Sequence, residues 1–297
     1  MVKHVVKERE LKLAVIGGSG LYQLKGSHLV AEHKIDTPFG PMSDTVRELD
    51  IDGKRVFFLA RHGQGHRFLP GEVPYRANIF GLKSLKVTHV LAVSAVGIMQ
   101  EYINPGDMVV PDQIFDRTKG TRPSTFFGEG VVGHVSFADP FCEELRNHIV
   151  QAAEESGARV HDGGTYVCME GPAFSTRAES EFYRKTLQPA VIGMTAIPEA
   201  KLAREAELCY GMLALATDYD CWHATEDDVT VEAVMAVLHQ NTDLAHRIVR
   251  RLTLNLPLMT QCQELRAAQN AIMTDRKIIP EAIRQKLDAL YGDYLRT

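Results

Sequence analysis

Hydrophobic residues in this chain fall into short runs that alternate with longer segments of helical periodicity. Strands are predicted for residues 12–17, 54–60, 89–94, 107–111, 164–169 and 191–194, and for an apolar run from 210 that ends at 218. Helices are predicted for residues 74–84, 139–156, 175–187, 198–207 and 229–256, with Gly157 as the C-cap of the second. This alternation predicts an α/β fold with a central mixed or parallel sheet flanked by helices on both faces.

Composition narrows the class of protein. The 297 residues show no shift in composition that would mark a boundary, so we predict a single domain over residues 1–297 with a polar helical tail from about 257. A formal net charge of -5 without a dense basic run argues against nucleic acid or an anionic membrane surface as partner. The N-terminus lacks the apolar stretch of a signal peptide, and the apolar-biased run 87–99 is too short to span a bilayer.

The cysteines are scattered along the chain, and none has the Cys-x-x-Cys spacing of a metal or redox motif. This distribution favours reduced thiols in a cytoplasmic protein over disulfides or structural zinc, so we expect no metal site. The five are Cys142, Cys168, Cys209, Cys221 and Cys262.

Two acids stand where the last predicted strand ends. Asp218 and Asp220 are two residues apart, so on an extended chain their side chains share one face. Burying such a pair is costly unless a ligand supplies hydrogens or positive charge, and the N7 and 6-amino edge of adenine would do so. The alternative is a solvated loop in which the spacing is accidental.

Other strand ends hold groups suited to an anion. The loop at residues 17–20 offers free backbone N–H groups and the hydroxyl of Ser19, while Arg61 and His62 offer a guanidinium fork and a further donor. Ser94 and Thr195 are hydroxyls at two more strand ends, so these side chains could surround one tetrahedral oxyanion. The alternatives are an ordinary glycine-rich turn and a surface Arg-His pair.

Several other chemistries fit less well. The glycine loop lacks the third glycine of a dinucleotide fingerprint and the Gly-Lys-Ser/Thr ending of a P-loop. No Gly-x-Ser-x-Gly elbow is present, which argues against a serine nucleophile. His62 and His66 are separated by two glycines, which argues against zinc ligation from a helix. Phe174 and Met194 could stack on a base and lie under a sugar, or could simply belong to the core.

Taken in order, these loops closely resemble the trimeric class of purine nucleoside phosphorylases. The matching segments are residues 16–21, 60–63, 104–107, 169–180, 193–195, 198–199 and 216–222. The similarity extends over roughly residues 11–255 in one collinear order, and the tail after Pro257 matches less distinctively. The resemblance implies a nucleoside phosphorylase-like fold and a homotrimer.

The resemblance also assigns roles to individual residues. It implies a phosphate site formed by Ser19, Arg61, His62, Ser94, Ala95 and Thr195. The first and fourth of these are often threonine in the family, and the serines here retain the hydroxyl. It further implies that the substrate contacts Phe174 near the purine, Met194 at the ribose, Asp218 and Asp220 at the purine edge, and His134 from a neighbouring subunit. Specificity would involve Ser175 at the base, and Val231 and Met235 at the 5′ substituent.

The activity implied is phosphorolysis of S-methyl-5′-thioadenosine to adenine and 5-methylthioribose 1-phosphate, in methionine and purine salvage. Relatives specific for 6-oxopurines carry asparagine near the two acids, so the acids favour adenine. Arg61 and His62 would position phosphate, and a protonated Asp218 would act as general acid. Inorganic phosphate is a co-substrate, and no metal or organic cofactor is expected. The alternatives are a purine nucleoside or methylthioinosine phosphorylase with broader base specificity, and a non-catalytic purine-binding protein. A further hypothesis is that the tail covers the 5′ pocket.

Overall fold

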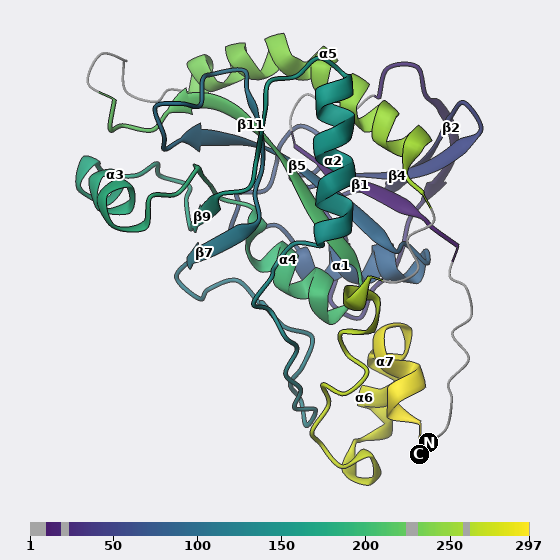
Figure 1. Ribbon diagram of the computed structural model, residues 1–297. Coiled ribbons are helices and arrows are strands. Elements are labelled where there is room, and N and C mark those ends of the chain that lie inside the picture. The colour runs from purple at the N-terminus through teal and green to yellow at the C-terminus, as the bar shows by residue number, and fades with distance from the viewer. Residues whose placement is uncertain (1–9, 19–23, 224–230, 258–261, 297) are drawn as a thin grey trace.

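A computed structural model describes residues 10–18, 24–223, 231–257 and 262–296. Its centre is an eleven-stranded mixed sheet with helices on both faces, which confirms the predicted fold class (Figure 1). The strands are β1 (Leu13–Gly17), β2 (His28–His33), β3 (Val46–Ile51), β4 (Lys54–Ala60), β5 (His89–Ile98), β6 (Met108–Val110), β7 (Gln113–Arg117), β8 (Val160–Asp162), β9 (Thr165–Met169), β10 (Val191–Gly193) and β11 (Cys209–Tyr219). Their order is β2-β3-β4-β1-β5-β10-β9-β7. Off this path, β11 pairs with β5 and β6, and β6 also pairs with β8.

The alternation of side chains along the central strands divides the interior into two cores. In β1, Ala14 and Ile16 belong to one core, whereas Leu13 and Val15 belong to the other. The same period of two runs through β5 and β11, as expected for strands that are buried on both faces.

Different helices cover the two faces. The helices α1 (Tyr75–Ser84) and α4 (Ala196–Glu205) contribute to the first core, and α2 (Glu143–Glu155) and α5 (Val231–Asn255) contribute to the second. Figure 1 shows α2 and α5 together on one side of the sheet, with α1 and α4 behind it. Among the helices of the described residues, none combines the length and the apolar content needed to cross a membrane.

The pairing along β5 leaves part of one edge open. β11 pairs with β5 over the whole of residues 89–98. On the opposite edge, β1 runs parallel to β5 only as far as Ala92, and β10 begins to pair antiparallel at Gly97. A strand has only two edges for pairing, so within the described part of the chain residues 93–96 have a strand neighbour on one side alone. This interruption at the centre of the sheet makes room for a cavity.

The tail is less polar than expected and is divided into short helices. It consists of the 3₁₀ turns Gln263–Arg266 and Arg276–Ile278 followed by α6 (Glu281–Lys286) and α7 (Asp288–Leu295). Leu290, Tyr291 and Leu295 are buried and join the core that contains α1. In Figure 1 the tail lies beyond α1, at one end of the molecule.

Several elements differ from the sequence prediction. β2, β3, β7 and β8 were not predicted, because their polar residues interrupt any apolar run. α2 begins at Glu143 instead of residue 139, since Cys142 is still extended. The helix predicted for residues 175–187 is α3 (Arg177–Phe182), capped by Thr176, and continues as a π-helical turn over Tyr183–Leu187. Gly157 adopts φ +82°, as its predicted role at the end of α2 requires.

Candidate active site

A cavity of about 260 Å³ lies along the open stretch of β5. Its wall comes from the ends of β1, β4, β5, β9, β10 and β11, from the loops that follow them, and from α5. The lining residues include Gly18, Arg61, His62, His66, Ser94, Ala95, Gly97, Met169, Phe174, Met194, Thr195, Thr217, Asp218, Asp220 and Met235. The fold thus brings most of the predicted site residues into one cavity.

Arg61 is completely buried at the base of this cavity. Its Nε and Nη2 donate to the two carboxylate oxygens of Glu199 at 2.8 and 2.9 Å, and Nη1 and Nη2 donate to the carbonyls of Val93 and Ile16. Burial lowers the pKa of Arg61, but the charge and hydrogen bonds of Glu199 raise it, so the guanidinium remains charged. The fork predicted to hold phosphate is thus occupied by Glu199. Of the five N–H groups of the guanidinium, four are donated to the described protein atoms.

His62 is held as a neutral ring with a defined orientation. Its Nδ1 lies 2.9 Å from the carbonyl oxygen of Phe68, and because a carbonyl can only accept, Nδ1 carries the proton. Burial and the charge of Arg61 lower the pKa of His62 to about 4. Its Nε2 is therefore an acceptor at neutral pH, and the prediction that His62 acts as a donor is wrong for this nitrogen. An acceptor suits the O–H of a monoprotonated phosphate or a ribose hydroxyl.

Two hydroxyls meet at the open edge of β5. Thr195 Oγ1 donates to Ser94 Oγ at 3.2 Å, and Ser94 is one of the partly accessible residues of its strand. These side chains come from β5 and from the turn that links β10 to α4, which lie next to each other because β10 pairs with the end of β5. Together with Arg61 and His62 they form one polar corner of the cavity.

Asp218 projects into the cavity from the end of β11. Its Oδ1 lies 2.7 Å from Thr217 Oγ1, which also lies 3.1 Å from the carbonyl of Val96. Burial raises the pKa of Asp218 to about 6; the Thr217 hydrogen bond opposes this rise and the charge of Asp220 adds to it. A carboxyl with this pKa is partly protonated near neutral pH, as a general acid needs to be.

Asp220 presents an oxygen that the protein does not satisfy. The residue is buried, and among the described residues its Oδ2 has no hydrogen-bond partner. Burial raises the pKa of Asp220, against the opposing effect of the Ser180 and Ser175 hydroxyls. An unpartnered buried acceptor costs free energy until a donor arrives, so this oxygen is prepared for an N–H group.

Gly97 allows the two acids to approach the sheet. A Cβ at this position would lie 3.0 Å from Ile192 Cγ2, 3.5 Å from Asp218 Oδ2 and 3.6 Å from Asp220 Cβ. A larger residue would therefore crowd the space that a purine edge has to enter. Apolar side chains line the rest of the cavity: Phe174 at its exposed rim, Met194, and Met235 from α5.

Four predicted residues are not among those that line the cavity. Ser19 lies outside the described residues, next to the lining residue Gly18, and the side chain of Val231 also lies outside the described part. Ser175 stands beside the cavity, where its hydroxyl lies 3.7 Å from Met169 Sδ. His134 is on a separate loop whose backbone donates to Ala271 in the tail, so it does not reach the cavity of its own chain.

Three further residues matter to the site, although the sequence pattern predicts no role for them in it. Glu199 neutralises Arg61, Thr217 sets the environment of Asp218, and His66 stacks on His62 with ring centroids 4.3 Å apart. The usable signal for Glu199 was an acid in the first turn of a helix whose residues are almost all buried. His66 was considered only as a zinc ligand.

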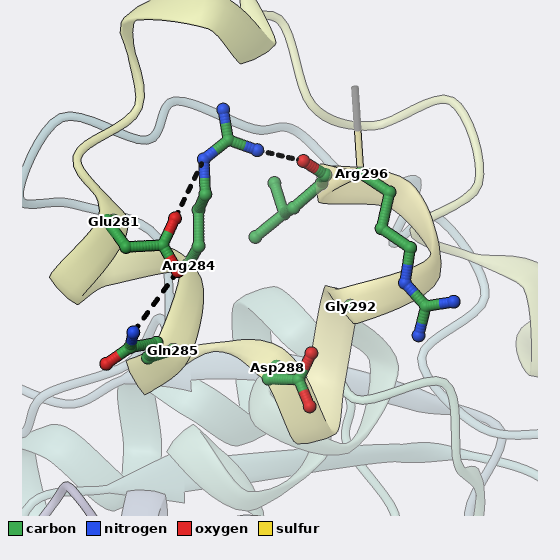
Figure 2. Close-up of a pocket in the computed structure, with 7 residues that line it drawn as sticks. Glu281, Arg284, Gln285, Asp288, Gly292 and Arg296 are labelled. Carbon is green, nitrogen blue, oxygen red and sulfur yellow. Dashed lines mark hydrogen bonds and ion pairs between the residues drawn. The ribbon is translucent and has the colours of Figure 1, made fainter.

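A larger hollow of about 800 Å³ lies within the tail, between α6 and α7 (Figure 2). Its polar groups interact with one another: Glu281 accepts a hydrogen bond from Gln285 at 3.2 Å and lies 4.0 Å from Arg284. It shares no lining residue with the cavity along β5, and no described tail residue lines that cavity. The hypothesis that the tail covers the pocket is therefore wrong for the described tail residues and the cavity of their own chain.

The fold and the cavity are those expected of a nucleoside phosphorylase, and comparison with known sequences agrees. Residues 12–253 match the phosphorylase superfamily, and the chain belongs to that family.

Its relatives within the family share one name. An S-methyl-5′-thioadenosine phosphorylase of Geobacter sulfurreducens is 54% identical over 286 residues, which cover 96% of this chain and 100% of the relative. One from Hyperthermus butylicus is 53% identical over 245 residues, covering 82% of this chain and 88% of the relative. The resemblance stated from the sequence is thus confirmed.

Solved structures point the same way. A methylthioadenosine phosphorylase from an antarctic soil metagenomic library superposes with a TM-score of 0.88 at 44% identity, covering 95% of this chain and 99% of the other. A methylthioadenosine phosphorylase from Schistosoma mansoni, solved in complex with adenine, gives 0.82 at 36% identity, covering 88% of this chain and 96% of the other.

Proposed function

We propose that the protein catalyses phosphorolysis of S-methyl-5′-thioadenosine to adenine and 5-methylthioribose 1-phosphate. The observation that carries the proposal is a pair of acids in the same cavity as the polar corner: Asp218 has a raised pKa, and Asp220 has an oxygen without a partner among the described residues. A 6-amino group can donate to Asp220, whereas the carbonyl of a 6-oxopurine would place two acceptors against each other.

The polar corner would hold phosphate as the nucleophile. Thr195 and Ser94 offer hydroxyls, Arg61 offers its remaining N–H, and neutral His62 accepts from the phosphate O–H. This arrangement would hold a phosphate oxygen in line with the anomeric carbon, which lowers the entropic part of the barrier. A new C–O bond forms as the C–N bond to adenine breaks.

The leaving group would be neutralised by Asp218. Negative charge develops on the purine as the C–N bond lengthens, and Asp218 donates its proton to N7. Asp218 is left as a carboxylate, next to the Thr217 hydroxyl that can donate to it. Proton donation of this kind contributes typically about 10²- to 10⁴-fold in rate.

The 5′ substituent would lie against apolar side chains, with Met194 near the ribose and Met235 farther along the cavity. An apolar wall discriminates only weakly against a hydroxyl, on the order of 10- to 200-fold, so adenosine is expected to be a slower substrate.

The proposal extends to assembly and location. We infer a cytoplasmic homotrimer in which His134 of one subunit reaches the 5′ end of a neighbour's cavity. The position of His134 on a loop outside its own cavity supports this role, and the five free thiols support a reducing compartment.

The test is base release from methylthioadenosine, methylthioinosine, adenosine and inosine, each with and without phosphate. The expected result is fast adenine release from methylthioadenosine only when phosphate is present. Release without phosphate would refute the phosphorylase proposal, and preference for an oxopurine would refute the roles of the two acids.

A further inference from the structure

Three cysteines that are far apart in the sequence converge on the side of the sheet that α2 and α5 cover. Cys142 precedes α2, Cys209 is the first residue of β11, and Cys262 begins the described part of the tail; we call these three the thiol cluster. All three are buried, and all are free thiols. Their sulfurs and a carboxylate oxygen of Glu264 lie within 4.8 Å of one another.

These distances match a tetrahedral metal site. With Zn–S bonds of about 2.3 Å, tetrahedral geometry places neighbouring sulfurs roughly 3.8 Å apart. The sulfurs of Cys142 and Cys262 are 3.6 Å apart, so ligands of this type would need little movement to surround an ion. We propose that the thiol cluster binds one Zn²⁺ per chain, with Glu264 as the fourth ligand.

The surroundings fit a buried cation with anionic ligands. Three thiolates and one carboxylate carry more charge than Zn²⁺ neutralises, and the guanidinium of Arg204 lies 3.7 Å from Glu264 to offset part of the excess. His89, which pairs with Cys209 across β5 and β11, is buried, and among the described residues its Nε2 has no hydrogen-bond partner.

Metal binding here would be coupled to proton release. Three Zn–S bonds form as the three S–H bonds break, so binding releases three protons, with no oxidation or reduction. Affinity should weaken as the pH falls. The other titratable or charged groups around the cluster are Glu144, Glu264, His89, His148 and Arg204.

The role implied is structural. Cys209 and Asp218 stand near opposite ends of β11, about 30 Å apart at roughly 3.3 Å per strand residue. The ion would tie the start of the tail to the sheet and to α2, without touching the catalytic cavity. This inference is therefore independent of the proposed reaction.

The test uses the full chain, purified with a reductant and stripped of metal by a chelator. Zinc added to this protein should bind at one ion per chain, and cobalt should give the absorption of thiolate-to-metal charge transfer. Cys142→Ser and Glu264→Gln should each weaken zinc binding, the first by about 100-fold or more, because changes even in the outer shell cost 10- to 100-fold. Cys221→Ser is the matched control, since Cys221 lies outside the cluster and should leave zinc affinity unchanged.

A second measurement needs no variant. Zinc should slow alkylation of Cys142, Cys209 and Cys262 without protecting Cys221, as read by mass spectrometry of the modified peptides. It should also raise the melting temperature in a way that excess chelator reverses. Absence of zinc binding in the titration, equal alkylation with and without zinc, or zinc binding that survives Cys142→Ser would each overturn the proposal.

Discussion

Replacing Asp218 by asparagine should make the protein less active and, at alkaline pH, more stable. Burial raises the pKa of Asp218 from 3.8 to about 6. Because the pKa is raised in the folded state, the contribution of protonated Asp218 to the free energy of unfolding is fully present below pH 3.8. It is lost as the pH rises through about 6. At about 1.36 kcal/mol per pH unit, a rise of this size costs the folded state roughly 3 kcal/mol at pH 8. Asparagine does not titrate and avoids that loss.

Activity should change in the opposite direction. With a pKa of about 6, roughly one-eleventh of Asp218 is protonated at pH 7, and this fraction falls about tenfold per pH unit above that. The kcat/KM of the wild type should therefore decline at alkaline pH. Asparagine can still donate a hydrogen bond to N7 but cannot transfer a proton, so turnover should fall about 10²- to 10⁴-fold and this limb of the profile should disappear.

The assay combines urea unfolding at about pH 5 and about pH 8 with pH profiles of kcat/KM on methylthioadenosine. Asp116→Asn is a control of opposite sign, because hydrogen bonds from Lys201 and Thr118 outweigh burial and lower the pKa of Asp116. The reasoning would be refuted if the Asp218→Asn protein kept the alkaline decline in kcat/KM. It would also be refuted if the stability of the variant relative to the wild type did not increase from the lower pH to the higher.

Other predictions follow from the same cavity. Asp220→Asn replaces an unpartnered acceptor by a donor and should raise activity on methylthioinosine relative to methylthioadenosine; an unchanged ratio of kcat/KM values would contradict its role. Thr217→Val removes the hydrogen bond that lowers the pKa of Asp218, so the alkaline limb should move to higher pH, and a shift to lower pH would contradict this. Glu199→Gln removes the charge from a fully buried ion pair and should cost about 3–5 kcal/mol in urea unfolding. Glu181→Gln, in an exposed pair, serves as its control and should leave stability unchanged.

The sequence predicted the central strands well because they are buried on both faces and form continuous apolar runs. It missed β2, β3, β7 and β8, where partly exposed strands mix polar and apolar residues without a clear boundary. It placed Asp218 and Asp220 together correctly, since neighbours in sequence at the end of a strand remain neighbours in space.

Interactions between distant residues could not be predicted in this way. The partner of Arg61 is Glu199, which lies on a helix far along the chain, and no spacing rule connects the two. The proton position on His62 depends on the carbonyl of Phe68, which only the fold of the loop brings near. The thiol cluster is the strongest case: scattered cysteines led us to expect no metal site, yet α2, β11 and the tail bring three of them together.

The open edge of β5 has a consequence for the motions of the sheet. Among the described residues, 93–96 lack a strand on one side, so the amides that point to that side depend on what fills the cavity for their protection from hydrogen exchange. Bound phosphate and nucleoside would occupy the place of the missing strand. Exchange at these amides should slow when both ligands are present, while the amides of β1 stay unchanged. Bound substrate would then stabilise the centre of the sheet, and this local stability would rise and fall with each catalytic cycle.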